Sequence, residues 1–187
     1  MTRSAAVLLS AMVLASCGGS PKTHFYTLDA VRGSQPAPAA HVSSPIVVGQ
    51  PQLPGELDRA ALVTRGAGNT IVVSDRDRWA APLDDLVRRT LTLDLRTRLP
   101  AGSVLAPGDP VPKNGRTLMV NVRRFMADES GHVTLDADWA VRRGNQSAPT
   151  RLVSVTAADA ESRSGDAIAA AMSQALGKLA DQIAAAL

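Results

Sequence analysis

Residues 133–141, VTLDADWAV, alternate between apolar and polar side chains with a period of two. Successive side chains of an extended strand point to opposite faces of a sheet, so this pattern predicts a strand with one buried face. The predicted inward side chains are Val133, Leu135, Ala137, Trp139 and Val141. We expect Asp136 and Asp138 to lie on the exposed face of the sheet. Such a strand needs a second, apolar layer packed on its inward face.

Two neighbouring segments predict strands beside this one. Residues 117–125 (TLMVNVRRF) alternate, and residues 151–157 (RLVSVTA) follow a stretch of turn-forming residues. The glycine in DESGH marks a turn between the first two of these strands. The three segments together predict an antiparallel meander.

The first half of the chain predicts shorter strands separated by turns. We expect strands over residues 24–30, 45–50, 62–64 and 70–74. The glycines in RGAGN suit the turn of a hairpin between the last two.

Two segments have helical periodicity. Residues 82–99 and 165–187 each place apolar side chains on one stripe, with Asp84, Asp85 and Asp166 near the helix starts and Ser164 as a candidate N-cap. Two amphipathic helices and these strands predict an α+β fold. We expect a mostly antiparallel, mixed sheet with both helices packed on one face.

The amino terminus has the layout of a secretory signal peptide. Arg3 precedes an apolar run of about a dozen residues, which is too short to span a bilayer. The run ends in LASC, which resembles the bacterial lipobox and implies cleavage before Cys17 and acylation of that residue. The alternative is a free, buried cysteine in a signal peptide that is cleaved elsewhere. We therefore expect a signal peptide over 1–16, a lipidated tether over 17–23 and a single domain over 24–187.

The acyl lipid on Cys17 is the one covalent group that we expect, with no other cofactor. Several acyl chains on one residue hold a protein firmly on a membrane, because each buried methylene contributes about 0.8 kcal/mol. Gly18 and Gly19 follow the cysteine where an aspartate would favour retention in the inner membrane. We therefore expect attachment to the outer membrane, on its periplasmic face.

The composition argues against several functions. The chain has 20 Lys and Arg against 17 Asp and Glu, which makes no basic stripe for nucleic acid. His24, His41 and His132 are far apart and lack metal-ligand spacing, so we expect no metal site. No GxSxG motif is present, and we expect no enzymatic activity.

Charged residues and a tryptophan crowd the turn-rich region between residues 53 and 83. The candidate partner-binding residues are Asp58, Arg59, Arg65, Arg78 and Trp79. One interpretation is a solvated loop in which the tryptophan covers the start of the first helix. The other is an ordered loop whose arginines pair with carboxylates of this chain or of a neighbour, with Trp79 as the anchor.

At these residues the sequence resembles the PqiC-type auxiliary lipoproteins of membrane-integrity transport systems. The resemblance covers the lipobox, FYTL, LPGELDRAALVTR, RWAAPL and the helix that follows. The matching positions are Leu53, Pro54, Leu57, Asp58, Arg59, Val63, Arg65, Arg78, Trp79, Pro82 and Leu83. Family members often have Glu where this chain has Ala81.

The resemblance implies a non-enzymatic subunit that docks to other proteins. The implied partners are an MCE-domain protein, which forms a periplasmic tunnel for lipid, or the components of an ABC-type transporter. The resemblance also implies a homo-oligomeric ring.

Two alternatives remain open. One is a periplasmic lipid carrier with a cavity lined by Leu91, Leu95, Met172 and Leu176. The other is an envelope hydrolase, which needs a Ser or a carboxylate within reach of a histidine.

Overall fold

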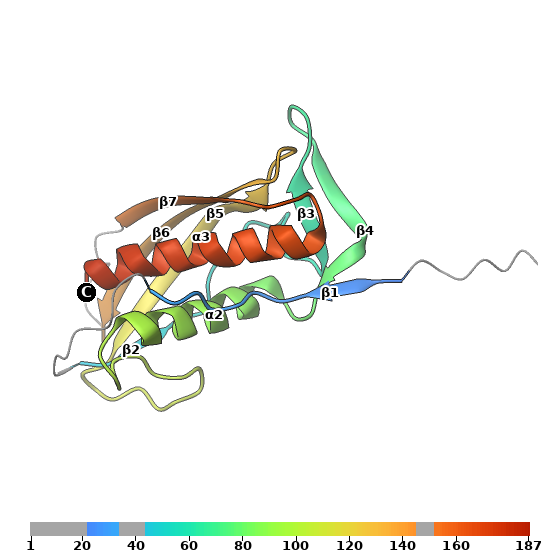
Figure 1. The fold of residues 1–187 in the computed structure, drawn as a ribbon. Helices are drawn as coiled ribbons and strands as arrows, with labels where there is room; N and C mark the ends of the chain where they lie inside the picture. Colours follow the sequence, from blue (N-terminus) through green and yellow to red (C-terminus); the bar gives the residue numbers. More distant parts are fainter. Residues whose placement is uncertain (1–21, 34–43, 145–151) are drawn as a thin grey trace, which may run out of the picture.

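The computed structural model describes residues 22–33, 44–144 and 152–187. The expected signal peptide, Cys17 and His41 lie outside these ranges. Along the described chain, four strands are followed by a helix, and three further strands are followed by a second helix (Figure 1). The strands are β1 (His24–Tyr26), β2 (Ile46–Val48), β3 (Ala61–Arg65), β4 (Ile71–Trp79), β5 (Arg116–Ala127), β6 (His132–Arg143) and β7 (Leu152–Asp159), and the helices are α2 (Leu83–Arg98) and α3 (Gly165–Ala185).

The described strands form one seven-stranded mixed sheet with the order β1-β4-β3-β5-β6-β7. The meander of β5, β6 and β7 is antiparallel, as predicted, and so is the β3–β4 hairpin. β2 pairs in parallel with the start of β5, and β3 pairs in parallel with its end. β1 pairs in parallel with the end of β4. The edges of the sheet along this path are therefore β1 and β7.

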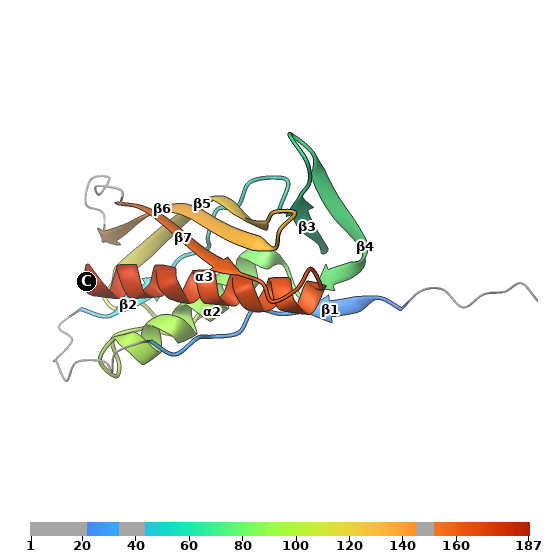
Figure 2. The ribbon, with the colours of Figure 1, turned by 45° about the horizontal axis from the view of Figure 1, so that its top comes forward.

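α2 and α3 lie on the same side of the sheet, which confirms the expected fold class (Figures 1 and 2). Leu86, Leu91 and Leu95 of α2 are fully buried, as are Leu176 and Leu179 of α3. They belong to a continuous apolar core shared with the sheet. Ser164 caps α3, because its hydroxyl accepts a hydrogen bond from the N–H of Ala167.

A β-bulge in β5 keeps the core continuous. The register with β6 shifts between Val122 and Arg124, so that Phe125 faces the core and is completely buried. Without the extra residue, Phe125 would point to the opposite face from Val122, because side chains alternate along a strand.

The outer face of the sheet differs from the prediction at Asp138. This residue is only 7% exposed, whereas the side chain of Asp136 is about one-quarter exposed. The side chain of Asn121 donates a hydrogen bond to Asp138, and Arg123 forms ion pairs with both aspartates, at 2.5 Å to Asp136 and 3.8 Å to Asp138. The neighbouring polar side chains of β5 therefore cover the acidic face that we expected to be open.

The segment that follows β1 binds to both helices instead of continuing as a strand to residue 30. The carbonyl of Leu28 accepts a hydrogen bond from Thr90 of α2, and the N–H of Asp29 donates to Ser173 of α3. The N–H of Val31 donates to the buried carboxylate of Asp94. We call residues 28–31 the N-terminal clamp. It fixes the start of the domain to the helical layer.

Candidate functional site

The end of the sheet where the chain enters the domain is built from β1 and β4. The sequence predicts a strand over residues 70–74 followed by turns, but β4 continues to Trp79 because its last three residues pair with β1. The paired residues are His24 with Asp77, Phe25 with Arg78, and Tyr26 with Trp79. Part of the expected charged loop is therefore a rigid strand.

Asp77 holds this junction together. Its carboxylate accepts hydrogen bonds from the hydroxyls of Ser74 (2.8 Å) and Tyr26 (3.1 Å), and lies 3.3 Å from Nδ1 of His24. Burial alone would raise the pKa of Asp77, but these three hydrogen bonds outweigh it and lower the pKa below its usual value. Burial and the neighbouring Asp77 carboxylate raise the pKa of the Tyr26 hydroxyl. Asp77 is therefore a structural anion.

The structure brings together four of the five candidate partner-binding residues. Asp58 and Arg59 lie exposed in the turn before β3, and Arg78 lies exposed on β4 next to Ala61. A backbone hydrogen bond of 2.7 Å from the N–H of Trp79 to Ala60 fixes the turn against the strand. Arg65 lies at the other end of β3, where its guanidinium reaches the carbonyl of Gly68.

Trp79 does not present an exposed anchor. Its side chain is 5% exposed and belongs to the apolar core, together with Leu57 and Leu83. The tryptophan therefore positions β4 and the start of α2, and the exposed neighbours Asp58, Arg59 and Arg78 form the accessible part of the region. Each of the two interpretations of the sequence is therefore partly correct. The region is ordered, as the second interpretation states, but the tryptophan covers the start of the helix, as the first one states.

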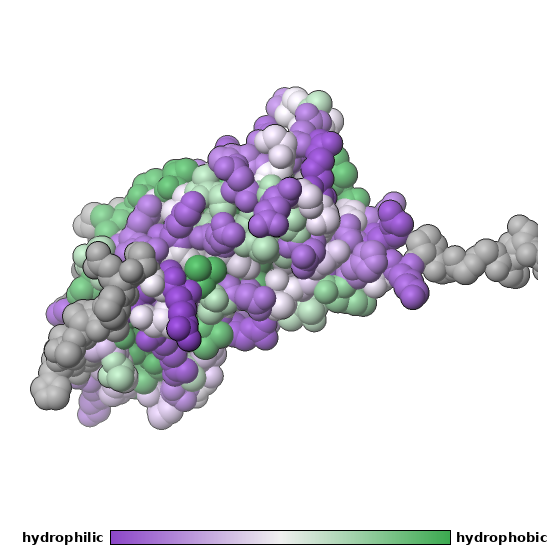
Figure 3. All heavy atoms as spheres, in the orientation of Figure 1, coloured by the Kyte–Doolittle hydropathy of each residue, from purple (hydrophilic) through white to green (hydrophobic). Residues whose placement is uncertain are grey.

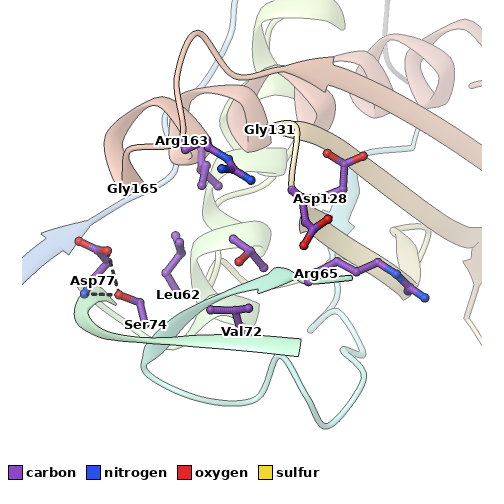
Figure 4. A pocket seen from close by; sticks show the side chains of 13 residues that line it. Leu62, Arg65, Val72, Ser74, Asp77, Asp128, Gly131, Arg163 and Gly165 are labelled. Atoms are coloured by element: carbon purple, nitrogen blue, oxygen red, sulfur yellow. Dashed lines mark hydrogen bonds between the residues drawn. The ribbon is translucent and has the colours of Figure 1, made fainter. Parts of the chain in front are cut away.

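A pocket of about 390 Å³ lies between the β3–β4 hairpin, the β5–β6 turn and the start of α3 (Figure 4). Leu62, Val72 and Ile168 supply its apolar wall. Arg163 and Arg65 contribute two guanidinium groups, and neither forms an ion pair within the described residues. This concave site combines an apolar wall with a polar rim.

Carboxylates share the rim of the pocket with these arginines. Asp77, Asp128 and Glu129 all line it. Asp128 accepts hydrogen bonds from the hydroxyl and the N–H of Ser130, which lower its pKa, and burial opposes this only in part. Three carboxylates thus face two guanidinium groups around the opening, so the pocket has no preference for an anion.

The site lacks the contacts of a hydrolase. His24 reaches Asp77, and His132 lies 2.6 Å from Asp159, so two histidines do meet carboxylates. The nearby Ser74, however, donates to a carboxylate and not to a histidine. Nucleophilic catalysis requires the hydroxyl to contact the base, and no such pair occurs in the described ranges. In the same ranges, no cluster of three or more His, Cys, Asp or Glu side chains could hold a metal ion.

The lipid-carrier alternative required a cavity between the helices and the sheet. The four residues expected to line it, Leu91, Leu95, Met172 and Leu176, are all buried in the continuous core. None of them lines the pocket described above. The space between the helices and the sheet is therefore filled by side chains, which argues against a carrier of this kind.

Sequence periodicity did not reveal two exposed apolar strand edges. Leu152, Val153 and Val155 are exposed on β7, and Ile71 and Val73 are exposed on β4. Figure 3 shows hydrophobic side chains along the upper margin of the molecule, over β7. β7 is an edge strand, and the first part of β4 is locally an edge because β1 pairs only with residues 77–79. An edge offers unpaired backbone groups as well as its side chains, so both edges are suited to contact with another protein.

Comparison with known proteins gives the family. Residues 26–184 match the family model described as an ABC-type transport auxiliary lipoprotein component. The chain belongs to this family. The match confirms the resemblance seen in the sequence. It also agrees with the expected non-enzymatic role, because this is a family of transport components.

Individual relatives extend over nearly the whole chain. The sequence is 28% identical over 180 residues to the intermembrane transport lipoprotein PqiC of Escherichia coli (strain K12), with 95% of each chain covered. The protein of the same name from Shigella flexneri gives the same values. In the described part of the chain, no helix has the length and apolar character needed to cross a membrane.

Two crystal structures share the fold at 20% sequence identity. One is of an uncharacterized protein, with a TM-score of 0.75, and the match covers 89% of this chain and 99% of that one. The other is of a protein from Xanthomonas campestris, with a TM-score of 0.72 and coverage of 87% and 93%. The α+β architecture is therefore shared with proteins of experimentally determined structure.

Proposed function

We propose that this lipoprotein is a subunit of an intermembrane lipid-transport or membrane-integrity complex, and that it acts by docking to other proteins. The observation that carries the proposal is the family match over residues 26–184. The absence of a serine–histidine contact in the described site fits a binding role. Exposed Asp58, Arg59, Arg65 and Arg78 on a rigid scaffold are the proposed contact residues.

The proposed anchor is an acylated Cys17 on the periplasmic face of the outer membrane, after removal of residues 1–16 by signal peptidase. We expect Cys17→Ala to release the chain into the soluble fraction of the cell envelope, whereas Ser20→Ala leaves it on the membrane. The measurement combines membrane fractionation with mass spectrometry of the native amino terminus. An unacylated sulfur, or an amino terminus at another residue, would contradict the proposal.

The proposed protein partners are an MCE-domain tunnel protein, other components of an ABC-type system and further copies of this chain in a ring. The open apolar edges at β7 and β4 support contact between copies, because they lie on different sides of the sheet path and a heterologous contact between them can close a ring.

Site-directed photo-crosslinking in intact cells tests these partners. A crosslinking residue in place of Arg59 or Arg65 is expected to give adducts with an MCE-domain protein or with a second copy, and the mass of each adduct separates the two. Arg142 is exposed at the opposite end of the sheet and serves as the matched control. Recovery of the chain alone from all three positions would count against a docking role.

A further inference from the structure

Phe25 is an exposed aromatic residue at the point where the chain enters the domain. Its side chain is 65% exposed, the largest fraction among the exposed large apolar side chains of the described residues. The parallel pairing of β1 with β4 fixes its backbone, so this exposure does not come from a loose end. A rigidly held, solvent-exposed phenylalanine is an apolar group with no partner inside its own domain.

Basic residues flank Phe25 on the outer face of β4. His24 and Tyr26 both contact Asp77, so alternation along the strand places Phe25 on the opposite face. Arg78 is the neighbour of Phe25 in the parallel ladder, and Arg76 is exposed two residues earlier. Neither arginine forms an ion pair within the described residues. Both arginines are exposed, so the face that they share with Phe25 is positively charged.

The length of the tether limits which part of the domain can reach the membrane. Six residues lie between Cys17 and His24, and the seven Cα–Cα steps of this segment span at most about 25 Å when extended. The 21 residues of α3 span about 32 Å, starting at Gly165 beside the ring of Tyr26. Figure 1 shows β1 at the end of the domain opposite the C-terminus. An anchor at Cys17 therefore holds the β1 end near the bilayer and leaves the other end of α3 away from it.

We propose that the face formed by Phe25, Arg76 and Arg78 contacts the anionic phospholipid surface that holds the anchor. The phenylalanine ring inserts at the level of the headgroups, and the guanidinium groups bind lipid phosphates. The inference rests on the proposed acylation of Cys17. It assigns Arg78 to the lipid and leaves Asp58, Arg59 and Arg65 as the residues that face other proteins. The C-terminal end of α3 then points into the periplasm.

The single cysteine of the chain allows a direct test. Mature chain (residues 17–187), purified without its acyl groups, is coupled through Cys17 to a maleimide lipid in vesicles that contain phosphatidylglycerol and brominated phosphatidylcholine. Phe25→Trp is the reporter, and Val153→Trp on β7, with a matched exposed fraction of 63% at the native residue, is the control. We expect the bromolipid to quench at least half of the fluorescence added at position 25 and to leave that at position 153 unchanged.

Each other pattern of quenching would overturn the proposal. Equal quenching at both positions would mean that the domain has no preferred orientation, and quenching at position 153 alone would place β7 on the membrane. A blue shift of the fluorescence added at position 25 that grows with protein concentration before vesicles are added would show that a second copy covers this face. Coupling supplies the anchor artificially, so the result is independent of whether the cell acylates Cys17.

The charged part of the contact is measured with the same chain uncoupled and its thiol blocked. Arg76→Gln/Arg78→Gln is expected to weaken binding to phosphatidylglycerol vesicles about tenfold or more, because each arginine near an anionic surface contributes roughly fivefold. Arg142→Gln/Arg143→Gln removes the same charge at the far end and is expected to leave binding unchanged. Equal losses in the two variants would show that only net charge matters and would overturn the assignment of this face.

Discussion

The buried carboxylate of Asp94 accepts a hydrogen bond of 2.7 Å from the backbone N–H of Val31. This contact joins α2 to the N-terminal clamp. Arg98 completes the arrangement, since its guanidinium donates to the carbonyl of Val31 and lies 3.5 Å from Asp94. The second carboxylate oxygen of Asp94 is buried without a hydrogen-bond partner. Burial of the carboxylate is the main cause of its raised pKa.

The stability of the domain should depend on pH through Asp94. Burial raises its pKa to about 6, and the hydrogen bond from Val31 and the charge of Arg98 oppose this only in part. Between pH 4 and 6 the folded chain keeps a proton that the unfolded chain has lost, so the free energy of unfolding falls as the pH rises. We expect Asp94→Asn to remove about 2 kcal/mol of this fall between pH 4.5 and 7.

Urea unfolding of the two proteins at several pH values checks this prediction. Asp77 and Asp128 have lowered pKa values, so their contributions to stability are lost only at lower pH and are common to both proteins. The decisive quantity is therefore the difference between the two curves. Parallel curves from pH 4.5 to 7 would show that Asp94 is already ionised in the folded state at the lower pH.

Arg98→Met should destabilise the domain strongly. The side chain is almost fully buried and donates to Val31, to the carbonyl of Gly177 (3.0 Å) and to the carboxylate of Asp181 (2.6 Å). Its loss leaves Asp94 without a nearby positive charge, which typically costs about 3–5 kcal/mol for a buried pair.

Arg89→Met is the matched control for this variant. Arg89 is exposed and also reaches the N-terminal segment, through a hydrogen bond to Thr27. We expect it to cost about 1 kcal/mol or less in chemical denaturation. Similar losses for the two arginines would contradict a special role for the buried guanidinium.

A side chain at position 177 should displace the N-terminal clamp. A Cβ at Gly177 would lie 3.0 Å from Cβ of Val31, so the helix needs glycine here to let the segment approach. We expect Gly177→Leu to cost about 1–3 kcal/mol through overpacking and to increase amide hydrogen exchange at residues 28–31. Gln174→Leu, on the exposed side of α3, should change neither measurement.

Trp139 and Ser154 should behave as an energetically coupled pair. The indole N–H donates a buried hydrogen bond of 3.0 Å to the serine hydroxyl, and this bond joins β6 to β7. Trp139→Phe or Ser154→Ala alone leaves one buried polar group without a partner, at a cost of about 1–3 kcal/mol each. The double variant should cost less than the sum by about 1 kcal/mol in thermal unfolding. Strict additivity would mean that the hydrogen bond contributes nothing.

Local periodicity was sufficient to predict the elements that pack on the core. Both helices and the meander occur close to the predicted residues, because their apolar stripes face one continuous core. The partner of each short strand depends on tertiary contacts and could not be predicted. The end of β4 up to Trp79 pairs both with β1, about fifty residues earlier, and with the start of β3, and neither pairing can be read from local periodicity.

The sequence predicted which residues form the candidate site, but not which of their side chains are exposed. The polar residues around Trp79 suggested an accessible anchor, yet the side chain turns into the core beside the start of α2. The exposure of Phe25 was not predicted, because a single aromatic residue in a short strand is expected to face the core. The sequence pattern also did not predict the bulge at Arg123. An inserted residue shifts the alternation of side chains along the strand without changing the composition.

The N-terminal clamp also determines how the domain carries mechanical load. A pull on the N-terminal end of the domain is resisted first by the three-residue ladder between β1 and β4, and next by the hydrogen bonds of Leu28, Asp29 and Val31 to the two helices. The load is thus shared between the sheet, through β4, and the two helices, through residues 28–31. A partner that pulls on the meander would therefore load both layers of the domain before the pairing of β1 with β4 is broken.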